Sequence, residues 1–191
     1  MVSTTGETTN RPTLFLVVLG GRTASSHIEL HDVRFVVGRS IEETLPDLRH
    51  QWFGQRQGLH LDAWMAVRAI DGWAVGVESL GLGVKRDPVS PQRERLWFVN
   101  LGGYQRESLG ELHQFGLVVA RSPQAAKAAA KRQWLKGALQ QHKDDLAAVD
   151  DCLAIEQLEL LGGERWLVRL EPHPEGLSQP QVPDWFGYRP I

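Results

Sequence analysis

An internal repeat constrains this chain more than any other feature. Shifting the 191-residue sequence by 82 positions aligns residues 14–67 with residues 96–149 without a gap, and 19 of the 54 aligned positions are identical. After an insertion of 11 residues in the second copy the match resumes, with Trp73 and Glu78 aligned to Trp166 and Glu171. The chain is therefore a tandem duplication, and two copies of one unit have to build its fold.

Each copy is expected to form a ββαββ unit. The apolar run of residues 14–19, ended by glycines, is typical of a buried strand, and the alternation over residues 33–37 indicates a second strand. Ser40 with Glu43 three residues later predicts a capping box, and Ser122 followed by proline predicts the second helix start. Asp71-Gly72 predicts a type I′ turn in a closing hairpin, which the insertion lengthens in the second copy.

The helical stripes give the expected core. The buried faces are predicted to comprise Ile41, Leu45, Leu48 and Trp52 in the first copy, and Ala126, Ala130 and Trp134 in the second. Pro46 inside the first helix is expected to kink it or to mark its effective start.

A single unit of this size is marginally stable, so the two copies are expected to bury each other's open faces. The predicted fold is α+β, a pseudo-twofold fused pseudodimer with one shared core. The predicted organisation is a flexible N-terminus at 1–13, repeats at 14–78 and 96–171, a linker at 79–95, and a docking C-terminal tail at 172–191. Three aromatic residues near the end, Trp185, Phe186 and Tyr188, favour docking of that tail.

Composition restricts the functional class. The net charge of −2 and the absence of a recognised motif argue against nucleic acid as a partner, although the second helix is basic. The apolar segment near the N-terminus is shorter than a signal sequence or the roughly 20 residues of a membrane span. One cysteine, Cys152, excludes an internal disulfide and fits a reducing compartment. These features predict a cytoplasmic protein without membrane contact, as a monomer or a homodimer.

Several short motifs carry a resemblance to a known family. They are "LGG" in both copies, "ELHD" at residues 29–32, "HLDAW" at 60–64 and "DGWAVGVE" at 71–78. The sequence resembles the bacterial family of uncharacterised proteins catalogued as domain of unknown function 1543, in two tandem copies over residues 14–171 plus the final "DWFGYRPI". The resemblance implies the tandem unit and no particular activity. The second copy departs from the pattern, since Asp32 becomes Gln114 and "HLDAW" becomes "HKDDL".

The chemistry-bearing side chains gather in the same motifs. Glu29 and His31 share one face of a strand, and His60 and Asp62 have the same spacing before the third strand. The candidate ligand-binding residues are Gly20, Gly21, Glu29, His31, Asp32, His60 and Asp62, with Gly102, Gly103, Glu111, His113, His142 and Asp144 in the second copy. The double glycines are predicted to form turns with positive φ rather than a phosphate-binding loop.

Three interpretations of these residues remain open. They can lock the structure, since His–Asp contacts at strand ends often do. They can bind a small polar ligand or a protein partner in the groove between the repeats, without catalysis, which is the function favoured here. The alternative is a metal-dependent or acid/base enzyme with one centre in the first repeat, formed by Glu29, His31, Asp32, His60 and Asp62. In that case His31, His60, Glu29 and Asp62 are the candidate ligands of a divalent transition metal.

Overall fold

The computed structural model describes residues 11–82, 93–104, 107–134 and 151–191. The first repeat comprises β1 (Thr13–Gly21), β2 (Leu30–Gly38), α1 (Ile41–Gln51), β3 (His60–Val67), β4 (Ala69–Ile70) and β5 (Trp73–Leu82). The second comprises β6 (Arg95–Gly103), β7 (Leu112–Ala120), α2 (Pro123–Gln133), β8 (Asp151–Ala154), β9 (Gln157–Glu159) and β10 (Glu164–Pro172). The first two strands and the helix of each repeat have bounds that differ by 82 residues, so the duplication is confirmed at the level of structure.

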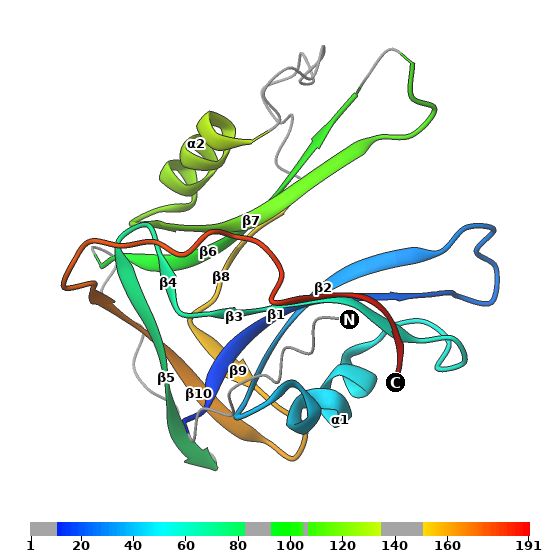
Figure 1. The fold of residues 1–191 in the computed structure, drawn as a ribbon, viewed down its shortest axis with the longest axis horizontal. Coiled ribbons are helices and arrows are strands. Elements are labelled where there is room, and N and C mark those ends of the chain that lie inside the picture. The colour runs from blue at the N-terminus through cyan, green and yellow to red at the C-terminus, as the bar shows by residue number, and fades with distance from the viewer. Residues whose placement is uncertain (1–10, 83–92, 105–106, 135–150) are drawn as a thin grey trace, which may run out of the picture.

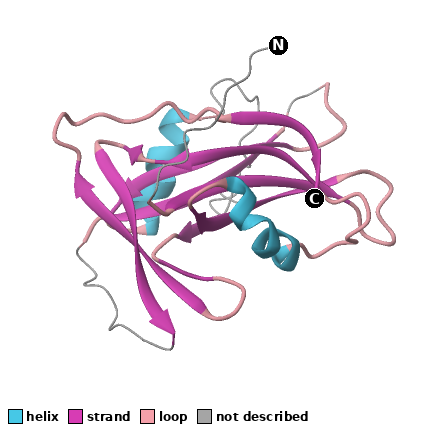
Figure 2. Ribbon diagram, turned by 60° about the horizontal axis from the view of Figure 1, so that its bottom comes forward, coloured by secondary structure: helices cyan, strands magenta, loops and turns pink. Residues whose placement is uncertain are grey.

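Within the described residues the strands form three antiparallel sheets, with the orders β11-β3-β1-β2, β4-β5-β10-β9 and β7-β6-β8. We call these sheets A, B and C. Helix α1 lies on the outer side of sheet A and α2 on the outer side of sheet C, so that the inner faces of the two sheets look toward each other (Figure 1). The strands β5 and β10 of sheet B lean across one side of the other two sheets (Figure 2). The result is the predicted α+β fold.

The pairing of β5 with β10 joins the two repeats through equivalent strands. Val77 pairs with Val168, and Val75 pairs with Leu170. Residues 75 and 77 of the first repeat align with residues 168 and 170 of the second, so exchanging the repeats turns each of these pairs into the other. This self-complementary pairing is the arrangement of a twofold homodimer within one chain. Strand β5 extends to Leu82, into the segment predicted as linker.

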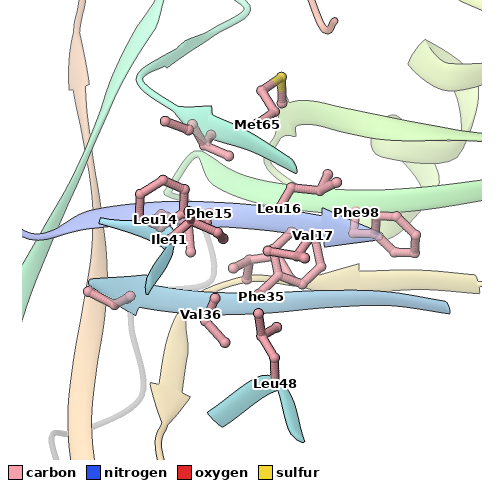
Figure 3. Close-up of a cluster of buried hydrophobic side chains, with 14 of the residues drawn as sticks. Leu14, Phe15, Leu16, Val17, Phe35, Val36, Ile41, Leu48, Met65 and Phe98 are labelled. Atoms are coloured by element: carbon pink, nitrogen blue, oxygen red, sulfur yellow. The ribbon is translucent and has the colours of Figure 1, made fainter. Parts of the chain in front are cut away.

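The repeats share one hydrophobic core. A single buried cluster contains Leu14, Phe15, Leu16, Val17 and Phe35 from the first repeat, together with Leu96, Phe98, Leu117, Ile155, Leu160 and Leu170 from the second. Figure 3 shows Phe98 beside Phe35, and the ring centroids of this edge-on pair are 5.6 Å apart. A second cluster of Trp97, Val99, Leu101, Val118, Ala120, Ala126 and Ala130 lies between sheet C and α2. The alternation of β6 residues between the two clusters follows from the two-residue period of a strand.

The helices follow the predicted stripes with two differences at their starts. Ile41, Leu48, Ala126 and Ala130 are buried as predicted. Ser122 Oγ accepts a hydrogen bond from the backbone of Ala125, but the Ser40 side chain makes no capping bond. Helix α1 begins at Ile41 and runs through its internal proline. In the described part of the chain, neither helix is long and apolar enough to cross a membrane.

The closing hairpin of the first repeat is shorter than predicted. The two-residue turn is confirmed, since Asp71 and Gly72 have φ angles of 49° and 80°. However, only Ala69 and Ile70 pair with β5 as a strand, because β3 belongs to sheet A and lies against β1. Strand β1 is apolar on both faces and therefore occupies a central position with a partner on each side.

The C-terminal segment docks on both repeats. Strand β11 (Trp185–Pro190) adds to the edge of sheet A by pairing with β3. The side chain of Gln181 accepts a hydrogen bond from the amide of Leu117 at 2.6 Å and donates one to its carbonyl at 2.7 Å. Of the three aromatic residues expected to favour docking, only Trp185 packs against the core, while Phe186 and Tyr188 are 77% and 67% exposed. Backbone pairing, rather than burial of three rings, holds this segment.

An ion pair links β11 to α1, with Arg189 Nη1 3.1 Å from Glu42 Oε1. Burial acts to raise the pKa of Glu42, but hydrogen bonds from its own backbone, from Arg189 and from Ser40 outweigh it, so the pKa lies below its usual value.

Candidate functional site

Three adjacent strands of sheet A bring four candidate side chains together at one end of its inner face. Gly20 of β1 pairs with His31 of β2 on one side and with His60 of β3 on the other. A β-bulge interrupts β3 at this point, because Val18 pairs with Ala63 while the next residue of β1 pairs with Leu61. The bulge leaves Asp62 without a partner in β1 and turns its side chain toward both histidines.

The four side chains contact one another in nitrogen–oxygen pairs. Asp62 lies between the two rings, with Oδ2 3.2 Å from His31 Nε2 and Oδ1 3.2 Å from His60 Nε2. Glu29 bridges the same two nitrogens, at 3.7 Å from His31 and 3.5 Å from His60. We call Glu29, His31, His60 and Asp62 the histidine–carboxylate cluster. The expected convergence of these two sequence segments is therefore found in the fold.

His60 is the fixed centre of the cluster. Its side chain is 1% exposed, whereas the side chains of His31, Glu29 and Asp62 are 53%, 41% and 29% exposed. Nδ1 of His60 lies 2.8 Å from the Gly58 carbonyl oxygen, and since a carbonyl only accepts, Nδ1 carries the proton. The ring of Tyr188 covers one side of the imidazole, with centroids 4.3 Å apart. Nε2 of His60 is thereby directed at the two carboxylates.

The double glycine of the first repeat is required by packing and not by a turn. A Cβ atom on Gly20 would lie 2.4 Å from His60 Nε2 and 2.8 Å from Asp62 Oδ2. A Cβ atom on Gly21 would lie 2.8 Å from the ring of Trp52. Both glycines belong to strand β1, and neither is among the residues with positive φ, so the predicted positive-φ turn is wrong. The lack of a side chain at Gly20 instead leaves the space that His60 and Asp62 occupy.

Asp32 lies outside the cluster, which corrects its assignment to the site. It is adjacent to His31 along β2, so its side chain points to the opposite face of the sheet. There it pairs with Arg34 at 2.6 Å and accepts a hydrogen bond from the amide of Val33. The second repeat has Gln114 and Gly116 at these positions, so both members of the pair are replaced together. The difference at Asp32 is therefore structural.

The second repeat reproduces part of the cluster. His113 pairs with Gly102 across β6 and β7, and its Nε2 lies 3.8 Å from Glu111 Oε2, while Gly103 pairs with Leu112. His142 and Asp144 lie outside the described residues.

The register of β8 contradicts the alignment of His142 with His60 and of Asp144 with Asp62. Phe15 pairs with Ala66 in the first repeat, and its counterpart Trp97 pairs with Ala154, although the 82-residue shift expects Ala148. Part of the insertion therefore precedes β8 and does not lengthen the hairpin.

A pocket of about 160 Å³ lies between the repeats, but its lining differs from the prediction. It is lined by Leu16, Val18, Ala63, Trp64, Met65, Phe115, Gly116, Gln181, Val182 and Pro183. None of the candidate histidines, carboxylates or double glycines is in this lining, so the expected polar lining is wrong for this pocket. The pocket is apolar because the inner faces of sheets A and C carry the core residues.

Two further side chains at these sites were not recognised from the sequence. Tyr188 covers His60, and Gln181 closes the pocket between the repeats. The docking of the C-terminal segment was expected, but no local pattern indicates which residues it would reach. In the described part of the chain, no three His, Cys, Asp or Glu side chains are grouped so that they could hold a metal ion.

Comparisons with known proteins agree with the duplicated fold. The model of a family described as Domain of Unknown Function (DUF1543) matches twice, at residues 26–77 and 108–157. The crystal structure of a protein Il1583 from Idiomarina loihiensis is similar over 94% of this chain and 97% of that chain, with 35% sequence identity and a TM-score of 0.65. No curated protein matches the sequence.

Proposed function

We propose a function for this chain, which belongs to the family described as Domain of Unknown Function (DUF1543), from the geometry of its own side chains, because the family description specifies no reaction. The proposed function is that of a non-enzymatic binding module. The binding site is the histidine–carboxylate cluster of the first repeat. Its ligand is a small polar molecule with a protonated amine.

The hydrogen-bonding capacity of the cluster carries this proposal. Because Nδ1 of His60 donates to Gly58, Nε2 of the neutral ring has only a lone pair to offer. Asp62 and Glu29 are acceptors when ionised, and the buried Asp62 Oδ2 makes no hydrogen bond, although it lies 3.2 Å from His31 Nε2. The two carboxylates bring four acceptor oxygens to only two imidazole Nε2 atoms, so the cluster has an excess of acceptors. A primary ammonium group supplies one positive charge and three donors, and its hydrogen bonds to carboxylates are charge-assisted.

The position of Asp32 favours binding over the enzyme alternative. That alternative uses five residues as one working centre, and Asp32 lies on the opposite face of the sheet in an ion pair with Arg34. The remaining four residues match a recessed binding site, since His60 is buried and His31 and Glu29 are accessible from solvent.

Methylamine, titrated into the protein and followed by NMR of the histidine rings, tests the proposal. A ligand of two non-hydrogen atoms gains at most about 3 kcal/mol, so the expected dissociation constant is in the millimolar range. Glu29→Gln should weaken binding at least tenfold. The matched control is Glu111→Gln in the second repeat, which should leave the dissociation constant unchanged.

Absence of histidine shifts in the wild-type protein, or equal effects of the two glutamine variants, contradicts the proposal. Near-stoichiometric transition metal in the purified protein, lost in Glu29→Gln, would favour the metal-dependent enzyme instead.

A further inference from the structure

The apolar pocket between the repeats lies next to the histidine–carboxylate cluster on the inner face of sheet A. We propose that the two form one composite site, and that it takes a primary amine carrying a compact aromatic group. The ammonium group lies at the cluster and the aromatic group in the pocket. This inference rests on the proposed function and specifies the class of its ligand.

The strand register establishes that the two regions are neighbours. Val33, Val18 and Ala63 form one row across β2, β1 and β3, and Val18 and Ala63 line the pocket. The next row on the same face consists of His31, Gly20 and His60. Consecutive same-face rows are about 6.8 Å apart, which is two residues of an extended strand. A short chain of methylene groups spans this distance.

The pocket matches an aromatic group in size and in polarity. Its volume of about 160 Å³ is close to that of cavities that hold a benzene-sized molecule. Aromatic and aliphatic side chains form most of its lining. Gln181 contributes an amide to the lining, but both ends of that amide are bonded to the backbone of Leu117. An apolar ligand group therefore displaces water without leaving this amide unsatisfied.

The position of the pocket also connects ligand binding with the duplication. Phe115 and Gly116 come from the second repeat, while Val182 and Pro183 come from the C-terminal segment. The absence of a side chain at Gly20 leaves room for His60 and Asp62, one same-face row from the pocket residue Val18. A ligand in the composite site contacts both repeats, and binding raises the stability of the whole chain.

Isothermal titration with benzylamine, phenethylamine and phenylpropylamine tests this inference, with methylamine and phenethyl alcohol as the single-group probes. The best phenylalkylamine should bind at least tenfold more tightly than methylamine, and the alcohol at least tenfold more weakly than that amine. Val182→Phe, at a 61% exposed pocket residue, places a ring over the pocket and should weaken phenylalkylamine binding at least fivefold without changing methylamine binding. Leu177→Phe is the matched control, since Leu177 is 53% exposed and does not line the pocket.

The possible results distinguish failure of the composite site from failure of the proposed function. If methylamine binds and phenylalkylamines bind no more tightly, the composite site is wrong while the proposed function stands. If Val182→Phe and Leu177→Phe have the same effect, the aromatic group does not occupy the pocket, and the inference is again wrong. If no amine binds, both proposals fail. Binding of phenethyl alcohol as tight as that of the amine would mean that the cluster takes no part.

Discussion

Replacing Gly20 by alanine tests the packing on which the cluster depends. The added Cβ atom would lie 2.4 Å from His60 Nε2, whereas unstrained contacts between such atoms are about 3.5 Å, so the ring has to move by about 1 Å. His60 is 1% exposed and is bonded to the Gly58 carbonyl, so it has little room to move. Overpacking of this kind costs about 1–3 kcal/mol, and a broken hydrogen bond costs about 0.5–1.5 kcal/mol.

The substitution also has a stabilising effect that has to be subtracted. Alanine restricts the unfolded chain and gains about 0.4–1 kcal/mol where the backbone accepts it, as it does here because Gly20 is not in the positive-φ region. The net loss is therefore about 0.5–4 kcal/mol, which corresponds to a fall in the melting temperature of about 1–16 °C for a chain of this length. Thermal unfolding followed by circular dichroism measures it.

A control glycine and a double variant make this prediction specific. Gly76 is another strand glycine without positive φ, and a Cβ atom there would meet nothing within 4 Å, so Gly76→Ala should leave the melting temperature unchanged or raise it. In a His60→Ala background the added methyl group has no ring to displace and only Asp62 Oδ2, at 2.8 Å, has to shift, so Gly20→Ala should cost clearly less than it does in the wild type. Equal effects of Gly20→Ala with and without the His60 ring would refute the packing argument.

Three other substitutions test other parts of the structure. Phe35→Ala removes one ring of the edge-on pair between the repeats and should cost about 3–5 kcal/mol in urea unfolding. A loss below about 1 kcal/mol would contradict a shared core. Gln181→Ala leaves the amide and carbonyl of buried Leu117 without their partner and should cost about 1–3 kcal/mol. An unchanged urea midpoint would mean that this bridge does not hold the tail. Glu42→Gln should be less stable than the wild type at pH 7, because the pKa of Glu42 is lowered in the folded state by hydrogen bonds, including that of Arg189. The difference should be fully present above the usual pKa of a glutamate and should be lost as the pH falls through the lowered pKa of the folded state, and a difference that is independent of pH across the acid range would exclude this linkage.

The repeat made the secondary structure predictable but did not reveal which strands pair. The same residues produced the same elements in both copies, as the identical spacing of β1 and β6 shows. The pairing of β5 with β10 could not be predicted, because the alternation of a half-buried strand is the same whether its partner is local or distant. The shift of β8 was hidden because identities at Ala148 and Val149 extended the ungapped alignment past an insertion.

The two-residue period of a strand predicts which side chains of the site share one face of the sheet. The two-residue spacing correctly grouped Glu29 with His31 and His60 with Asp62. The same rule puts Asp32 on the other face, where it pairs with Arg34. The role of Gly20 could not be foreseen, because its reason is a ring contributed by a different strand.

The placement of β11 has a consequence for synthesis of the chain. The outer edge of β3 acquires its partner only when residues 185–190 emerge from the ribosome, after the entire second repeat. Until then the nascent first repeat exposes a row of free amide and carbonyl groups beside a strand rich in apolar residues, which is a hazard for intermolecular association. Translation pauses within the second repeat should therefore increase the yield of insoluble protein.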